Sequence, residues 1–410
     1  MLNIAYLVNF SYYSDTKKYS VFPPLPEILM KFIHTSDWHI GRQLHNQSLI
    51  DDQRHVLAQI LALAEEHAVD AMIIAGDIYD RSIPPANAVA LLDDVVNKLV
   101  NEMKIPVIMI AGNHDGHERL GFASRQMSDS GLHIIGPLHN ALSPITLKGR
   151  SGGAAFYGLP YADPATVRQV FDCEVSSHEQ AMEVLLEQVH GHDSQGLPKV
   201  VIGHCFLDGG SESESERPLS IGGADKISPT LFTPFNYTAL GHLHGPQYKG
   251  EEQIRYSGSI LKYSFSEQHQ KKSVTLVEFD DQGKAQIALL PLTAKRDVRI
   301  VEGELSVLLE SGKTDPNRDD YLMVRLLDKH AILDAMGKLR SVYPNVLHLE
   351  RTGLMSDNGQ LEIRRDHIKK GELDMFTEFF AQVSGESMNE SQQQAMVRAI
   401  DELHKGEQSS

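Results

Sequence analysis

The chain has 410 residues, of which 41% are hydrophobic and 23% are charged, as in an ordinary globular protein. This composition excludes a wholly disordered or fibrous chain, and the length suggests about two to three domains. With 38 basic and 55 acidic residues, the net charge of −17 argues against a protein that coats nucleic acid with its own surface. No apolar run approaches the roughly 18 residues of a membrane helix. The two cysteines, Cys173 and Cys205, fit a reduced, cytoplasmic compartment.

The first 29 residues contain neither a signal peptide nor a clear fold element. Their charged residues lie in the middle of the segment, and no apolar core follows a basic start. Met30 stands directly before a strand-like run. We therefore expect residues 1–29 to be a non-native or disordered extension, with a poorly packed N-terminal tail as the alternative.

Between Met30 and Leu138 the sequence alternates between short apolar runs and helical patterns. The runs predict strands at 32–35, 71–75 and 107–111, and the patterns predict helices at 49–64 and 86–100. Such alternation favours an α/β architecture. Further strands are expected at 154–159, 200–203, 237–240, 254–257 and 274–279. Because turns separate the later runs, we expect part of the sheet to be antiparallel.

The character of the sequence changes near Arg296. A strand at 321–326, a helix at 331–342 and a strand at 346–349 predict a small α+β unit, and the last 40 residues read as amphipathic helix. The predicted divisions are a main domain over 30–295, a small α+β capping domain over 296–365 and a helical tail over 366–410. The acidic stretch 211–216 is expected to be an exposed loop.

Five short polar clusters each follow directly on a predicted strand. They are Asp37-Trp38-His39, Gly76-Asp77-Ile78-Tyr79-Asp80, Gly112-Asn113-His114-Asp115, Gly203-His204 and Gly241-His242-Leu243-His244. The carboxyl ends of strands in α/β sheets open onto the crevice where ligands bind. The clusters are therefore expected to converge, and the glycines are expected to permit sharp turns and close backbone approach.

The side chains in these clusters suit a pair of metal ions. Asp37 and His39, two apart in an extended chain, would point to the same side and could hold one cation, as could His242 and His244. Asp77 could bridge two cations, and Asn113 and His204 add an amide oxygen and an imidazole. Nitrogen and oxygen ligands without thiolate favour manganese, iron or zinc over calcium or a structural zinc. Such a site would be locally positive, as a phosphate substrate requires.

The order D-x-H, G-D-x-x-D, G-N-H-D, G-H, G-H-x-H resembles that of the calcineurin-like metallophosphoesterases. The segments that resemble the SbcD family of bacterial nuclease subunits more narrowly are HTSDWHIGRQLH (34–45), AGDIYDRSIPPANAV (75–89), AGNHDGHERLGFASR (111–125) and YSGSILKYSFSE (256–267). The resemblance implies a two-sheet β-sandwich flanked by helices, with a small α+β cap domain and a helical C-terminal tail.

The resemblance also implies roles for the individual residues. One metal would be held by Asp37, His39, Asp77 and His244, and the other by Asp77, Asn113, His204 and His242. His114 matches the catalytic histidine, which would contact the phosphate or protonate the leaving 3′-oxygen. Asp80 would orient the substrate or a histidine that lies next to the metal ligands without binding the metal.

The implied activity is hydrolysis of DNA by a water that two metal ions, expected to be manganese, activate. It comprises 3′–5′ exonuclease action on duplexes and endonuclease action on hairpins and single strands, in recombination, repair and replication. The implied assembly is a heterotetramer of two nuclease subunits, which contact each other as a homodimer, and two SbcC-type coiled-coil ATPases held by the tail. No membrane is involved.

Two other functions remain open on the sequence. The same metal scaffold could serve a small-molecule phosphodiesterase or a protein phosphatase, although a cap and a helical tail would be superfluous there. The chain could also be a catalytically silent scaffold that only docks an ATPase, although the intact ligand set argues against this.

Overall fold

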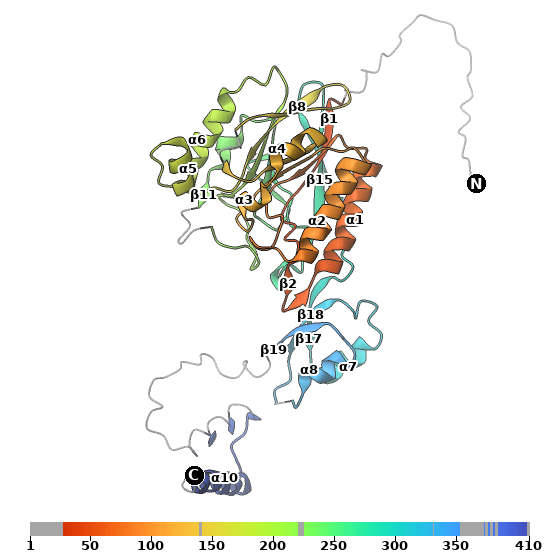
Figure 1. Cartoon of the computed structure of the whole chain (residues 1–410). Helices are drawn as coiled ribbons and strands as arrows, with labels where there is room; N and C mark the ends of the chain where they lie inside the picture. The colour runs from red at the N-terminus through yellow and green to blue at the C-terminus, as the bar shows by residue number, and fades with distance from the viewer. Residues whose placement is uncertain are drawn as a thin grey trace, which may run out of the picture.

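The computed structural model describes residues 28–138, 142–219, 225–330, 332–352, 373, 376–377, 380–381 and 384–407. Two mixed sheets lie face to face in the larger lobe, and a three-stranded sheet forms the smaller one (Figure 1). This arrangement confirms the predicted α/β two-sheet sandwich flanked by helices. No helix among the described residues is long and apolar enough to cross a lipid bilayer.

The first sheet carries the N-terminal strand at its centre. Its order is β16-β15-β1-β4-β5-β6, with β1 at Met30–Thr35, β4 at Ala71–Ile74, β5 at Val107–Ile110, β6 at Leu132–Ile135, β15 at Ser273–Phe279 and β16 at Ala285–Pro291. Strands β1, β4, β5 and β6 are parallel, whereas β15 is antiparallel to both β1 and β16. Strands β4 and β5 are buried along their whole length, as expected for parallel strands covered on both faces.

The second sheet has the order β13-β14-β12-β9-β8-β7. Its strands are β7 Ile145–Lys148, β8 Gly153–Leu159, β9 Lys199–His204, β12 Tyr237–Gly241, β13 Gln247–Lys249 and β14 Glu251–Tyr256. The central strands β8, β9, β12 and β14 are parallel, and the edge pairs β7·β8 and β13·β14 are antiparallel. The predicted antiparallel pairing therefore occurs at the edges of this sheet and at β15 of the first sheet.

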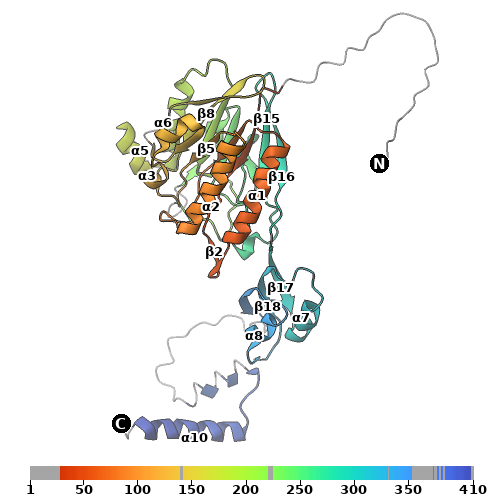
Figure 2. The same ribbon diagram turned by 45° about the vertical axis from the view of Figure 1, so that its right-hand side comes forward.

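Two apolar cores hold these layers together. Phe32 of β1 meets Phe156 of β8 and Tyr237 of β12 edge to face, with ring centroids 5.5 and 5.7 Å apart, inside the core between the sheets. The outer face of the first sheet is covered by α1 (Ile50–Glu66), α2 (Ala86–Asn97) and a π-helical turn η1 (Lys98–Glu102), as Figure 2 shows. Helices α5 (Pro164–Phe171) and α6 (His178–Gly191) precede β9.

The smaller sheet has the order β17-β18-β19, with β17 at Val298–Gly303, β18 at Tyr321–Leu326 and β19 at Val346–Arg351. Helices α7 (Leu305–Gly312) and α8 (Ala335–Arg340) pack on it around a separate core. Asp52 of α1 joins this unit to the larger lobe, because its carboxylate accepts hydrogen bonds from Arg296 at 2.6 Å and from the hydroxyl of Tyr321 at 2.9 Å.

The C-terminal tail is described only in part. Helix α10 spans Glu390–Glu407, and Met396 and Ile400 on it are half-buried. Much of the predicted helical tail before α10, including Val383, lies outside the described residues, as does most of the segment 1–29. The predicted helix at 331–342 is shorter in the structure, and β17 and α7 were not expected from the sequence. The domain boundaries stay predictions.

Candidate dinuclear metal centre

The five predicted clusters lie at the carboxyl ends of parallel strands. Asp37 follows β1, Asp77 follows β4 and Asn113 follows β5, three neighbouring strands of the first sheet. His204 ends β9, and His242 and His244 follow β12, its neighbour in the second sheet. Both sheets therefore deliver metal-capable side chains to one edge of the sandwich, as the sequence predicted.

The loops after β1 and β4 run side by side. The backbone N–H of Asp37 donates to the Gly76 carbonyl at 3.1 Å, and that of His39 donates to the Asp77 carbonyl at 2.9 Å. Asp37, His39 and Asp77 have positive φ angles of 51, 43 and 49°, so this backbone is left-handed rather than extended. Asp37 and His39 therefore approach the same centre through a strained turn, and not through the strand alternation assumed from their spacing.

Three glycines before the ligands have no room for a side chain. A Cβ on Gly112 would lie 2.2 Å from Asp77 Oδ1. A Cβ on Gly76, whose φ is +89°, would lie 2.3 Å from His204 Nδ1. A Cβ on Gly241 would lie 1.9 Å from the Ala75 carbonyl oxygen. A Cβ on Gly203 would meet Leu240 at an ordinary 3.5 Å, so close approach does not explain that glycine.

One group of ligand atoms comes from Asp37, His39 and His244, which are all buried and lie within 4.8 Å of one another. The Nε2 atoms of His39 and His244 are 3.1 Å apart, and His39 Nε2 is 3.5 Å from Asp77 Oδ2. Two imidazole nitrogens and carboxylate oxygens thus point at a common position, which is the donor set of a divalent transition metal.

A second group contains Asp37, Asp77 and His204. His204 Nε2 lies 3.5 Å from Asp77 Oδ2 and 3.0 Å from Asn113 Oδ1. The other ring nitrogen, Nδ1, lies 2.9 Å from the Ala75 carbonyl oxygen and donates its proton there. This hydrogen bond leaves the Nε2 lone pair of His204 facing Asp77 and Asn113. Asp77 belongs to this second group and lies 3.5 Å from His39 of the first, so it could bind a metal ion at either position.

His242 stands at the border of the second group. Its backbone N–H donates to the two carboxylate oxygens of Asp37 at 3.0 and 3.2 Å, and its φ is 106°. Its ring centroid lies 5.5 Å from that of His204. The ring is therefore adjacent to the ligand cluster, although none of its atoms belongs to any of the three groups of possible ligands among the described residues.

The electrostatics of the centre favour a bound cation. Burial raises the pKa of the Asp37 carboxyl well above its usual range, and the neighbouring Asp77 adds to this. Burial also lowers the pKa of the His39, His204 and His242 imidazoles, so these rings are neutral at pH 7. Neutral imidazoles and crowded carboxylates are the forms that coordinate metal ions, and a cation would remove the cost of burying the negative charge. The residues fit divalent metals.

His114 lies at the rim of the centre, where it forms a third group of possible ligand atoms with His39 and Asp77, all within 4.8 Å of one another. Its Nδ1 is 2.8 Å from the backbone carbonyl oxygen of Asp80, and its backbone N–H donates to Asp77 Oδ1 at 2.9 Å. The Asp80 carboxylate pairs with Arg42 at 3.1 Å and lies 3.9 Å from His39 Nδ1. Arg42 therefore supports the loop of Asp80 in this structure.

Several residues that support the site were not found from the sequence. Ser215 is buried and its Oγ lies 2.5 Å from His244 Nδ1, which corrects the prediction that 211–216 is simply an exposed loop. Glu267 and Lys272, both buried, form an ion pair with 2.6 Å between Oε2 and Nζ. Burial alone would raise the pKa of the Glu267 carboxyl, but Lys272 holds it below its usual range. The sequence could have indicated that His244, as a predicted metal ligand, needs a hydrogen-bond partner for Nδ1. It could not have indicated that Ser215 is this partner.

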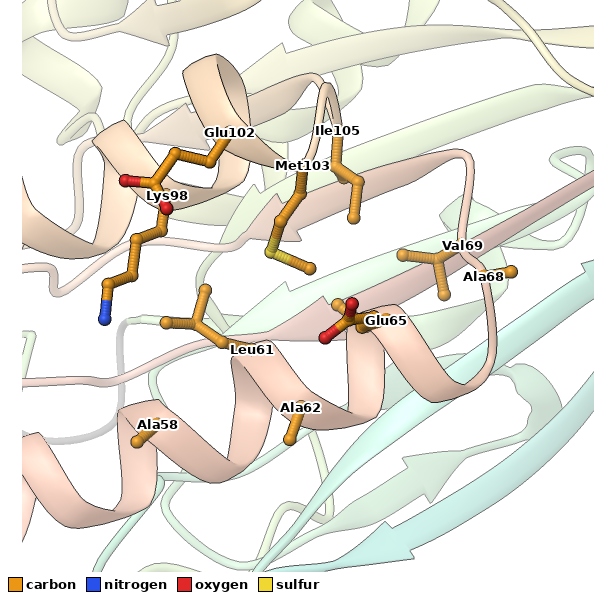
Figure 3. Close-up of a pocket in the computed structure, with 11 residues that line it drawn as sticks. Ala58, Leu61, Ala62, Glu65, Ala68, Val69, Lys98, Glu102, Met103 and Ile105 are labelled. Atoms are coloured by element: carbon orange, nitrogen blue, oxygen red, sulfur yellow. The ribbon is translucent and has the colours of Figure 1, made fainter.

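A separate groove of about 740 Å³ lies between α1 and the segment 98–105. Figure 3 shows Leu61 and Glu65 of α1 on one side of it and Met103 and Ile105 on the other. None of the residues that line it belongs to the predicted metal ligands. It therefore has no part in the chemistry of the strand ends.

Two family models match the chain, one in the larger lobe and one in the region that contains the smaller sheet. A family model described as calcineurin-like phosphoesterase matches residues 30–246, more than half of the chain. A model described as the type 5 capsule protein repressor C-terminal domain matches residues 294–384. The SbcD subunit of the nuclease SbcCD from Staphylococcus epidermidis is 37% identical over 321 residues, which cover 78% of this chain and 85% of the relative. The chain belongs to the SbcD family of calcineurin-like phosphoesterases.

The solved structures that match this SbcD-family chain are more distant from it. A protein from Thermus thermophilus is 13% identical, with a TM-score of 0.36 over 64% of this chain and 99% of its own. A dimetal phosphatase from Danio rerio is 9% identical, with a TM-score of 0.39 over 66% and 98%. The family membership and the ligand clusters together make the chain a metal-dependent hydrolase.

Proposed function

We propose that this chain is the manganese-dependent nuclease component of an SbcCD-type complex. One metal ion would be held by Asp37, His39, Asp77 and His244, and the second by Asp77, Asn113, His204 and His242. The convergence of ligands from five strand ends on one position carries this proposal. The 37% identity to the SbcD subunit of a nuclease supports DNA as the substrate.

The protein's own residues would orient the phosphodiester for hydrolysis. Bound divalent cations would supply a nucleophilic hydroxide and neutralise charge on the phosphate oxygens. His114, with Nδ1 bonded to the Asp80 carbonyl, can turn its Nε2 toward the substrate and hydrogen-bond the phosphate or protonate the leaving 3′-oxygen. Asp80 acts as a positioning residue through that carbonyl and through its ion pair with Arg42.

The proposed activities are 3′–5′ exonuclease action on duplex DNA and endonuclease action on hairpins and single strands, in recombination, repair and replication. The net charge of −17 fits an enzyme whose partner supplies much of the DNA-binding surface. We assign that role to an SbcC-type coiled-coil ATPase in an assembly of two copies of each subunit. A cytoplasmic location follows from this role.

The proposed division of labour follows the predicted boundaries. Residues 30–295 would form the nuclease domain, 296–365 the cap and 366–410 the segment that binds the ATPase. The separate core around Leu322 and Leu339 supports an independent cap. The half-buried Met396 and Ile400 on α10 support an apolar face for the ATPase.

Cleavage assays test this function directly. The purified chain is incubated with manganese and with duplex, hairpin and single-stranded DNA, alone and with the ATPase subunit, and bis(p-nitrophenyl) phosphate is the reference substrate. We expect DNA cleavage that depends on manganese. Absence of cleavage in every combination, or hydrolysis of the small diester that exceeds DNA cleavage by orders of magnitude, would refute the proposal.

A further inference from the structure

We propose that Ser215, bridging Glu267 and His244, is a positioning residue that fixes the proton of His244 on Nδ1 and directs its Nε2 lone pair at the metal. This inference deepens the proposed function and rests on it, because it concerns one ligand of the proposed centre.

The three side chains form one continuous chain of hydrogen bonds. Ser215 Oγ lies 2.5 Å from His244 Nδ1, and the same hydroxyl donates to Glu267 Oε1. His244 Nδ1 and Glu267 Oε1 are themselves 3.5 Å apart, and the hydroxyl lies within hydrogen-bonding distance of both atoms. All three residues are buried, with exposed fractions of 7% for Ser215, 1% for His244 and 0% for Glu267. Burial excludes water as a competing partner and makes each of these bonds costly to lose.

Counting protons gives the direction of every bond in this chain. Glu267 also pairs with the Lys272 ammonium at 2.6 Å and accepts the backbone N–H of Tyr263 at 3.2 Å, so it is an ionised carboxylate that can only accept. The single hydroxyl proton of Ser215 therefore goes to Glu267. Ser215 Oγ must then accept from His244 Nδ1, which leaves Nε2 unprotonated and facing His39 and Asp37.

Lys272 contacts both Glu267 and the backbone of His244, the two residues that Ser215 bridges. Its ammonium donates to the backbone carbonyl of His244 at 2.9 Å and to Ser259 Oγ at 2.8 Å, besides its bond to Glu267. The backbone N–H of His244 donates to Glu216 Oε1 at 2.8 Å. The ring, the carbonyl and the N–H of this one residue are thus each held by a separate partner.

The other histidines are supported differently. His204 Nδ1 donates to the backbone carbonyl of Ala75, which no side-chain substitution removes. His39 Nδ1 is buried without a hydrogen-bond partner among the described residues, and the Asp80 carboxylate is 3.9 Å away. Of these three histidines, His244 is therefore the one whose orientation depends on a side-chain hydroxyl. Partners that orient metal-bound histidines are typically worth about 10–100-fold in metal affinity.

The test measures Mn²⁺ binding by the full chain with electron paramagnetic resonance of the free ion. A series at position 215 separates hydrogen bonding from packing: Ser215→Thr keeps the hydroxyl, Ser215→Cys keeps most of the volume with a weak acceptor, and Ser215→Ala removes the bridge. We expect the affinity of one of the two metal ions to fall about 10–100-fold in Ser215→Ala, less in Ser215→Cys and least in Ser215→Thr.

Ser264→Ala is the matched control. Ser264 Oγ donates to the same Glu267 Oε1 at 3.2 Å, but within the described part of the chain it makes no hydrogen bond to His244. We expect its manganese affinities to equal those of the unchanged chain, and the thermal midpoint of each metal-free variant reports any general loss of stability. Unchanged affinities in Ser215→Ala, or an equal loss in Ser264→Ala, would overturn this inference alone. Failure of the unchanged chain to bind manganese would overturn the proposed function as well.

Discussion

The Nε2 atoms of His39 and His244 lie 3.1 Å apart, although 205 positions separate the two residues in the chain. Both rings are buried, and the low pKa that burial gives His39 keeps its ring neutral at pH 7. His244 Nδ1 donates to Ser215, so its Nε2 presents a lone pair to His39. Only a shared proton or a cation makes such a contact favourable, and the carboxylates of Asp37 and Asp77 favour the cation.

Replacing the carboxylate that borders both ligand groups should empty most of the centre. In Asp77→Asn the side chain keeps its size but loses its charge, so we expect the manganese content to fall from two ions to at most one. Cleavage should fall by more than the roughly 10–100-fold typical of residues that only orient ligands. Metal analysis after dialysis measures the content, and a variant that retains two ions would contradict the bridging role.

Removal of the His114 ring should separate chemistry from metal binding. We expect His114→Ala to retain its manganese and to lose DNA cleavage by about 10²–10⁴-fold, the usual contribution of a general acid or base. His55→Ala, at an exposed position of α1, is the control and should cleave normally. Loss of metal from His114→Ala would show that this ring is a ligand.

Metal removal should destabilise the larger lobe. A ligand that binds only the folded state stabilises it by about 2.7 kcal/mol at a concentration 100 times its dissociation constant. We therefore expect the thermal midpoint to rise with manganese and to fall again with a chelator. The same titration on Asp77→Asn should give a smaller rise. Equal midpoints with and without manganese would contradict binding to the folded chain.

The glycine before Asp77 should be irreplaceable for reasons of space. Gly76 has a φ of +89°, and a Cβ there would meet His204 Nδ1 at 2.3 Å. Gly196 has a similar φ of +81°, but no described atom lies within 4 Å of its Cβ position. Gly76→Ala and Gly196→Ala therefore share the backbone strain, about 1–3 kcal/mol, and differ in the clash. Urea unfolding should show a clearly larger loss for Gly76→Ala, and equal losses would exclude the clash.

Acidic solution should destabilise the fold through His34. Burial lowers the pKa of this imidazole to about 3 from 6.5, and its ring is held by the Tyr237 hydroxyl at 2.9 Å and the Leu240 carbonyl at 3.2 Å. Between about pH 3 and pH 6.5 the unfolded chain binds more protons than the folded chain. The contribution of His34 to the unfolding free energy is therefore complete above about pH 6.5 and falls as the pH approaches 3. The slope is about 1.4 kcal/mol per pH unit.

The variant His34→Gln retains a donor and an acceptor but does not titrate. Between pH 7 and pH 5 the unchanged metal-free chain should lose about 2 kcal/mol more of its unfolding free energy than the variant. Urea unfolding at both pH values measures the difference. Parallel pH profiles for the two chains would show that His34 is not the group responsible.

The sequence was sufficient for the strands that carry the site. The apolar runs before Asp37, Asp77 and His204 end where β1, β4 and β9 end or one residue away, because a buried parallel strand is a continuous apolar run closed by a polar turn. Strand β16 was not predicted, since it alternates between half-buried and exposed residues at an edge. Helix α5 was missed because its eight residues bury only Val167. Helix α6 was overlooked although Ala181, Met182, Leu185, Leu186 and Val189 form an apolar face at helical spacing.

The residues that hold the metal ligands in place could not be predicted as well from the sequence. Ser215 lies in an acidic stretch that reads as a surface loop, and its partners His244 and Glu267 are 29 and 52 positions away. Nothing local to Ser215 indicates that the loop folds back over a histidine. The left-handed turns at Asp37 and His39 were equally hidden, because neither residue requires a positive φ.

Asp37 and Asp77 come from one sheet of the sandwich, whereas His204 and His244 come from the other. The catalytic apparatus therefore does not exist in either half alone, and it is assembled only when the two layers have docked with the correct register. A chain in which only one sheet has formed lacks half of the predicted ligands and cannot assemble the metal centre. Metal binding therefore depends on the docking of the two sheets, and activity is expected only in the fully folded chain.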